Sequence, residues 1–154
     1  MTATSAPTPT RSAGGTLLTR VGLVILAFQG LLSGIWATAS PRGYFDDFPG
    51  FGLSWVSPDG PYNEHLMRDY GALNLALGIV ALCAAIWLTR TLVITAAAAW
   101  IVYSIPHIVY HALNGDPYDT SEHISILVSL FFAPIVAIVV LWSMRPAAEA
   151  QTSS

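Results

Sequence analysis

One stretch decides the fold: Tyr70 to Tyr110, which reads YGALNLALGIVALCAAIWLTRTLVITAAAAWIVYSIPHIVY. It contains two apolar windows, Tyr70–Thr89 and Thr91–Tyr110, and only Arg90 separates them. About 20 helical residues, each rising about 1.5 Å, cross the roughly 30 Å of hydrocarbon in a bilayer. The stretch therefore predicts two transmembrane helices that form an antiparallel hairpin.

Two further windows of this kind are Val21–Ser40 and Ser125–Met144. The 154-residue chain is 54% hydrophobic and only 10% charged, whereas soluble domains carry about a quarter charged residues. No alternating ten-residue strands occur, so helices must satisfy the backbone hydrogen bonds in lipid. We predict an all-α fold, a four-transmembrane-helix bundle over residues 17–145, between disordered tails at 1–16 and 146–154.

The arginines predict the orientation, because basic residues near span ends mark the cytoplasmic side. Eight of the nine acidic residues, from Asp46 to Glu122, fall at the opposite end of such a bundle. All six basic residues are arginine, which is typical of GC-rich bacterial genomes. We expect a multi-pass protein of the bacterial plasma membrane with both termini cytoplasmic. The arginines at the cytoplasmic end are Arg11, Arg20, Arg90 and Arg145.

The first window also allows a different interpretation, because residues 37–39 form the Ala-Thr-Ala pattern that signal peptidase cuts. Cleavage would leave three spans. The leader would exceed the usual 15 to 30 residues or so, and the apolar run is long enough to stay as an anchor. Gly30 and Gly34, with Gln29 and Ser33 at the same spacing, predict close packing against another helix.

A long extracytoplasmic loop is predicted between the first two helices, from Pro41 to Pro61. Its glycines and prolines argue against a regular helix, and its aromatic residues favour a position in the membrane interface. The loop either caps the outer mouth of the bundle or only anchors itself among headgroups. Its aromatic residues include Trp55.

Four ionisable residues directly precede the second span: Glu64, His65, Arg68 and Asp69. Glu64 and Arg68, like His65 and Asp69, have the i,i+4 spacing of helical ion pairs, so they could simply be a well-paired helix start. The next helices, however, place more polar groups at the same level, and ionisable residues beside spans tend to face a bundle interior. We predict a ligand-binding pocket in the outer leaflet. Its remaining candidate residues are Trp55, Asn74, Tyr103, His107, His111 and Glu122.

Several chemistries fit this polar layer. His107-x-x-x-His111 presents two imidazoles on one helix face, and His65 and His123 could complete a metal site, although HxxxH alone is a weak signal. Haem is less favoured, because arginine and carboxylates crowd the layer and no C-x-x-C-H motif occurs. The one cysteine, Cys83, forms no disulfide or CxxC site within the chain.

Three functions follow from this pocket as hypotheses. The first is binding of a small ligand, either a lipid or quinone-like molecule or a metal ion. The second is a non-catalytic accessory or scaffold subunit, held by buried ion pairs, in a homo-oligomer or membrane complex. The third is a membrane enzyme in which His65 and Asp69 provide acid–base chemistry on a lipid-like substrate. The acidic chain lacks a basic stripe, so nucleic acid is not an expected partner, whereas the lipid bilayer is.

The pattern NEHLMRDYGALNLALG at 63–78, followed by HIVYHALN at 107–114, resembles small actinobacterial four-helix membrane proteins loosely grouped as DoxX-like. The likeness covers roughly Pro41 to Asn114 and lies in layout. It implies a four-helix membrane fold, and no functional residue is carried over from it.

Overall fold

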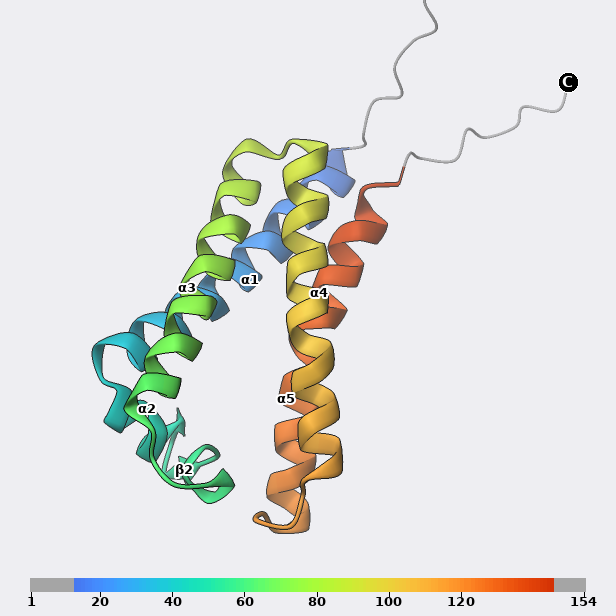
Figure 1. Cartoon of the computed structure of the whole chain (residues 1–154). Coiled ribbons are helices and arrows are strands. Elements are labelled where there is room, and N and C mark those ends of the chain that lie inside the picture. Colours follow the sequence, from blue (N-terminus) through green and yellow to red (C-terminus); the bar gives the residue numbers. More distant parts are fainter. Residues whose placement is uncertain (1–12, 146–154) are drawn as a thin grey trace, which may run out of the picture.

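A computed structural model describes residues 13–145, which form four long helices and a short folded segment between the first two (Figure 1). Each long helix is apolar and long enough to cross a bilayer. The predicted all-α bundle is therefore confirmed, and the protein is a multi-pass membrane protein. The long helices are α1 Ala13–Ala39, α3 Glu64–Trp87, α4 Arg90–Leu113 and α5 Thr120–Ser143.

All four long helices begin before their predicted windows. α1 begins at Ala13, so residues 13–16 are helical rather than part of a disordered tail. Near this start, the Thr19 hydroxyl donates to the Gly15 carbonyl oxygen at 2.8 Å. α3 begins at Glu64 because Asn63 accepts a hydrogen bond from the Leu66 amide as its N-cap. Residues 1–12 and 146–154, and with them most of both predicted tails, lie outside the described residues.

α1 and α3 pack with their backbones in close contact. A Cβ atom built on Gly34 would lie 2.6 Å from the Leu75 nitrogen, and one on Gly78 would lie 2.8 Å from the Leu31 nitrogen. These distances are too short for any side chain, so only glycine permits this approach. The close packing predicted from Gly30 and Gly34 is confirmed.

The core lies towards the end of the bundle where α1 starts and α5 finishes, which we call the termini end (Figure 1). Leu23, Leu26, Val93 and Val140 are fully buried there. The hydroxyls of Thr19 and Ser143 share a buried 2.7 Å hydrogen bond that joins α1 to α5. Towards the opposite end, the α1–α3 pair and the α4–α5 pair diverge.

This opposite end, the α2 end, carries the segment that was expected to be an irregular loop. The expectation was wrong for Pro41–Asp47, which forms α2. Proline is well tolerated in a first helical turn, where no amide donor is needed, and Tyr44 and Phe45 bury the inner face of α2. The rest of the segment is a two-stranded antiparallel sheet, β1 Pro49–Gly50 with β2 Leu53–Ser54, and a 3₁₀ turn, η1 Ser57–Asp59.

Candidate functional site

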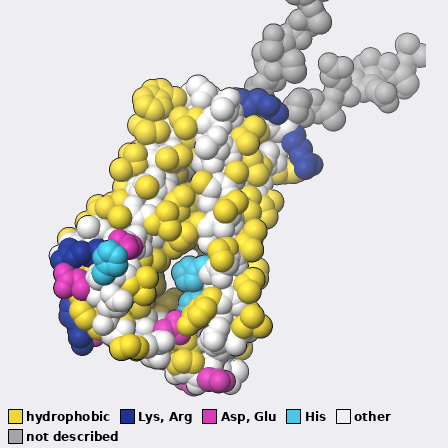
Figure 2. All heavy atoms as spheres, viewed as in Figure 1, with side chains coloured by type: hydrophobic (Ala, Val, Ile, Leu, Met, Phe, Trp, Pro, Cys, Tyr) yellow, Lys and Arg dark blue, Asp and Glu magenta, His cyan; other side chains and the backbone are white. Residues whose placement is uncertain are grey.

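A cavity of about 1110 Å³ lies between the two helix pairs at the α2 end. All four long helices, α2 and η1 contribute to its walls. Figure 2 shows the hollow between the two halves, with histidine and acidic side chains at its edge and a largely hydrophobic outer surface. Trp100, in the bundle core, also lines it, so the cavity reaches down to the packed part of the membrane domain.

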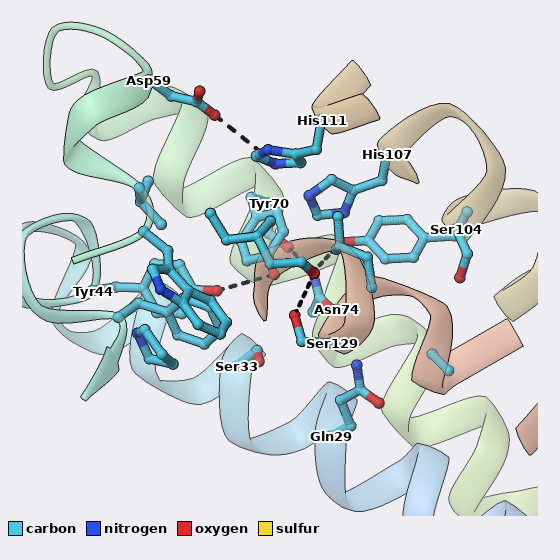
Figure 3. Close-up of a pocket in the computed structure, with 18 of the residues that line it drawn as sticks. Gln29, Ser33, Tyr44, Asp59, Tyr70, Asn74, Ser104, His107, His111 and Ser129 are labelled. Carbon is cyan, nitrogen blue, oxygen red and sulfur yellow. Dashed lines mark hydrogen bonds and ion pairs between the residues drawn. The ribbon is translucent and has the colours of Figure 1, made fainter. Parts of the chain in front are cut away.

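Tyrosine and asparagine side chains form one polar wall of the cavity (Figure 3). The Tyr44 hydroxyl, from α2, donates to the Tyr70 hydroxyl on α3 at 3.0 Å. One turn deeper, the Asn74 amide donates to the Tyr103 hydroxyl on α4 at 3.1 Å and to the Tyr70 carbonyl oxygen at 3.0 Å. Buried Asn74 thus links the two helix pairs across the cavity.

Two histidines and one aspartate continue this wall towards the α2 end. His107 and His111 lie on one face of α4 with ring centroids 5.1 Å apart, and His107 also meets the Tyr103 ring edge-on at 5.9 Å. The His111 Nε2 atom lies 3.9 Å from an Asp59 carboxylate oxygen (Figure 3). Among the described residues that line the cavity, Asp59 is the only carboxylate, His107 and His111 are the only histidines, and none is lysine or arginine.

The phenols beside the α2 segment are neutral donors. Burial raises the pKa of Tyr44 well above its ordinary value of 10.0. Burial, and then the negative charge of Asp59, raise the pKa of Tyr118 in the same way. The Tyr118 hydroxyl donates to the Trp55 carbonyl oxygen at 2.7 Å, which ties the α4–α5 connection to the segment before α3.

Four buried polar atoms of the cavity lining have no hydrogen-bond partner within residues 13–145: Gln29 Oε1, Trp55 Nε1, Trp100 Nε1 and His111 Nδ1. A buried donor or acceptor that stays unpaired costs about 1–3 kcal/mol. Four such atoms around one cavity are therefore an unusual concentration, and buried polar atoms of this kind are typically matched by a ligand or by water. Figure 3 shows Gln29 and Ser33 projecting from α1 towards the same space.

The structure brings half of the predicted pocket residues to this cavity. They come from three elements: the segment before α3, α3 itself and α4. They are Trp55, Asn74, Tyr103, His107 and His111.

The motif before the second span does not reach the cavity, which corrects the expectation that its charges gather there. Arg68 binds Glu64 at 2.7 Å and donates to the Thr38 carbonyl oxygen at 2.7 Å, with about half of its side chain exposed. His65 and Asp69 form a more exposed pair at 3.2 Å. The reason is helical phase: the cavity face of α3 is set by Tyr70 and Asn74, and these four residues lie on its other faces.

Glu122 and His123, the predicted site residues at the start of α5, also have structural contacts rather than a place in the cavity. Asp119 caps α5 by accepting from the Ser121 and Glu122 amides, and the Glu122 side chain does not line the cavity. His123 Nε2 donates to the His111 carbonyl oxygen at 2.7 Å.

The predicted metal site is not assembled. With His65 on the surface and His123 bonded to the backbone, only His107 and His111 of the four candidate metal ligands face the cavity. Within residues 13–145, no group of three or more His, Cys, Asp or Glu side chains has an arrangement that could hold a metal ion.

Sequence reasoning missed several polar side chains of the lining. Tyr70 could have been found from its i,i+4 relation to Asn74, and Gln29 and Ser33 share one face of α1 but were assigned to helix packing. Asp59 had no periodic signal, because it lies in a short irregular turn. The polar lining residues absent from the predicted set include Gln29, Ser33, Tyr44, Asp59, Asn63, Tyr70, Ser104, Tyr110 and Ser129.

The sequence matches no protein-family model, and comparison with curated proteins and with solved structures finds no similar chain. The DoxX-like resemblance therefore stays a prediction.

Proposed function

We propose that the protein binds a small amphipathic molecule, lipid-like or quinone-like, in the cavity at the α2 end. The observation that carries the proposal is the set of four buried, unpartnered polar atoms in the lining, within a wall that is otherwise mostly apolar. Ligand sites characteristically combine apolar walls with a few placed polar groups. The indole N–H groups of Trp55 and Trp100 would donate to the polar head of the ligand, and its apolar part would contact the remaining walls.

The donors favour a head group that bears carbonyl oxygens. The indole nitrogens of Trp55 and Trp100 can only donate hydrogen bonds, so each requires an acceptor. Because no lysine or arginine is found among the described lining residues, an anionic phosphate or carboxylate would be buried without a permanent counter-charge. An uncharged quinone-like head provides acceptor oxygens without burying a negative charge, and so fits the cavity better than a phospholipid head does.

We infer that the cavity opens towards the extracytoplasmic side of a bacterial plasma membrane. Arg20, Arg90 and Arg145 lie at the termini end, and basic residues near span ends favour the cytoplasm. The two arginines at the α2 end, Arg42 and Arg68, are each paired with an acid. The same inference places both termini in the cytoplasm.

Acid–base catalysis on a bound ligand is a second candidate, and one observation favours it. Asp59 and His111 face each other at 3.9 Å beside the cavity, and catalytic contacts are often long before a substrate binds. This pair replaces His65 and Asp69, which lie on the surface. A metal-ion site has less support, because only two of its four candidate ligands share the cavity.

The binding proposal is tested with Trp100→Phe, which keeps an aromatic ring and removes the N–H donor. Trp142→Phe is the matched control, since Trp142 is 60% exposed on the outer surface of α5. Purified protein in lipid nanodiscs is titrated with decylubiquinone, a short-tailed benzoquinone. We expect Trp100→Phe to weaken binding about tenfold, the equivalent of one hydrogen bond of about 1.4 kcal/mol. No binding to the parent protein, or equal binding by both variants, would contradict the proposal.

A further inference from the structure

We propose that the ligand carries an apolar tail that leaves the cavity sideways between α1 and α5, so that the site is loaded from the hydrocarbon of the membrane. This inference rests on the proposed function and names the class of ligand: a tailed, uncharged molecule that resides in the bilayer. A water-soluble ligand would instead enter the cavity through the α2 end.

Three apolar side chains mark the lateral opening, because each lines the cavity and is also exposed on the outside of the bundle. Phe28 and Leu32 of α1 are 66% and 54% exposed, and Phe132 of α5 is 50% exposed. A side chain that contacts both spaces lies where the wall between them ends. We call this opening the α1–α5 window.

The window lies at the middle of the spans. Phe28 is near the midpoint of the 27-residue α1, and Phe132 is near the midpoint of the 24-residue α5. Nearer the termini end the same two helices are closed against each other by the Thr19–Ser143 hydrogen bond and by the contact of Gly22 with Val140. The window is therefore open at the height where acyl chains surround the protein.

A second set of exposed lining residues is at a different height. Leu66 and Tyr110 are 57% and 47% exposed, on the α3–α4 side. Leu66 is in the first turn of α3 and Tyr110 is in the last turn of α4, which places this side at the level of the membrane interface. Asp59 and His111 are at the same end of the cavity, so this side suits polar groups, whereas the window suits an apolar tail.

The size of the cavity agrees with a ligand longer than its head group. Sites for drug-sized molecules have volumes of roughly 300–1,000 Å³, and this cavity has about 1110 Å³. A quinone-sized ring does not fill such a space by itself. The first part of a tail that points to the window would occupy the remainder and contact Phe28, Leu32 and Phe132.

The test narrows the window without changing the polar wall. Leu32→Trp adds bulk at the window, and Ile35→Trp is the matched control, since Ile35 is 57% exposed on the same helix and does not line the cavity. Two probes are titrated in nanodiscs: decylubiquinone and its tail-free parent, 2,3-dimethoxy-5-methyl-1,4-benzoquinone. We expect Leu32→Trp to weaken or slow binding of the tailed probe about tenfold and to leave the tail-free probe unchanged, whereas Ile35→Trp changes neither.

The outcomes separate this inference from the proposed function. If Leu32→Trp leaves the tailed probe unaffected while Trp100→Phe still weakens it, the cavity binds the ligand but the window is wrong. If neither probe binds the parent protein, both proposals fail for this ligand class. A decyl-tailed quinone with a diazirine at the tail end gives a second measurement on the parent protein: labelling of α1 and α5 supports the window, and labelling confined to α3 and α4 overturns it.

Discussion

Tyr118 donates a 2.7 Å hydrogen bond to the carbonyl oxygen of Trp55, a residue 63 positions earlier in the chain. The bond connects the α4–α5 loop with the segment that precedes α3, and so holds the two helix pairs together at the α2 end. Apart from this bond and the Asn74–Tyr103 bond, the two pairs contact each other mainly through the packed core at the termini end. The stability of the α2 end therefore depends on a small number of polar contacts.

The change Tyr118→Phe removes this bond and keeps the ring. We expect it to lower the free energy of unfolding by about 1 kcal/mol, because the bond is partly buried and the Trp55 carbonyl oxygen loses its donor. Unfolding by denaturing detergent, titrated into a mild detergent, measures the loss. Tyr62→Phe serves as the control, since the Tyr62 ring packs on Phe45 and would remain; an equal loss in both variants would contradict the prediction.

Gly78→Val tests the close contact of α1 with α3. The new Cβ would meet backbone atoms of α1, at 2.8 Å from the Leu31 nitrogen and 3.0 Å from the Gly30 carbonyl carbon, and backbone cannot move aside locally. We expect destabilisation of about 1–3 kcal/mol, as found for overpacked interiors. Ala76→Val, at an exposed position of the same helix, is expected to have little effect on the same unfolding transition. Equal stability of the two variants would contradict the prediction, because it would mean that α1 and α3 can move apart without loss of stability.

The N-cap of α5 predicts a dependence on pH. Hydrogen bonds from the Glu122 amide and from Ser121 hold the pKa of Asp119 below its ordinary value of 3.8. A carboxyl group whose pKa is lower in the folded state stabilises the fold above its unfolded pKa, and this contribution is lost as the pH falls through the folded pKa.

The stability difference between the parent protein and Asp119→Ala is therefore expected to be constant near neutral pH and to shrink between about pH 5 and pH 2. Asp119→Asn is the control, because asparagine caps helices without titrating in this range. Unfolding curves at several pH values provide the comparison. A difference that grew on acidification would have the wrong sign for this cap.

Arg68→Met separates the cavity from the charged motif beside it. Arg68 pairs with Glu64 and with the Thr38 carbonyl oxygen at the end of α1, and it does not line the cavity. We expect a loss of stability of at most about 1 kcal/mol, as for exposed ion pairs, and unchanged binding of decylubiquinone. If a stably folded Arg68→Met protein binds decylubiquinone much more weakly, the prediction is contradicted, and the motif at 64–69 would be part of the binding site.

The membrane fold was predictable because it depends on long-range composition. Apolar windows and scarce charges identify four helices whatever their packing, and Gly30 with Gly34 identified the contact face of α1. The ends of the helices were less predictable, since they depend on individual contacts, such as the local Asn63 cap and the long-range bond between Thr19 and Ser143. α2 was missed because the burial of Tyr44 and Phe45 outweighs the unfavourable composition of the segment.

The candidate site was only half predictable, and the reason is geometric. His107, His111, Tyr103 and Asn74 lie on helix faces that the 3.6-residue period assigns correctly. The charges of the motif at 64–69 lie at the same height, yet sequence alone does not fix the rotation of α3 about its axis. Asp59 comes from an irregular turn, whose position follows from the fold of the whole segment between α1 and α3.

The Thr19–Ser143 bond has a mechanical consequence. α1 cannot approach α3 more closely, because glycine backbones touch there, and the Thr19–Ser143 hydrogen bond joins α1 to α5 near the termini end. Because the packed core also joins the two helix pairs at this end, we expect any spreading of the bundle to be smallest there. A ligand too large for the cavity is therefore expected to strain the Tyr118–Trp55 bond at the α2 end before it disturbs the core.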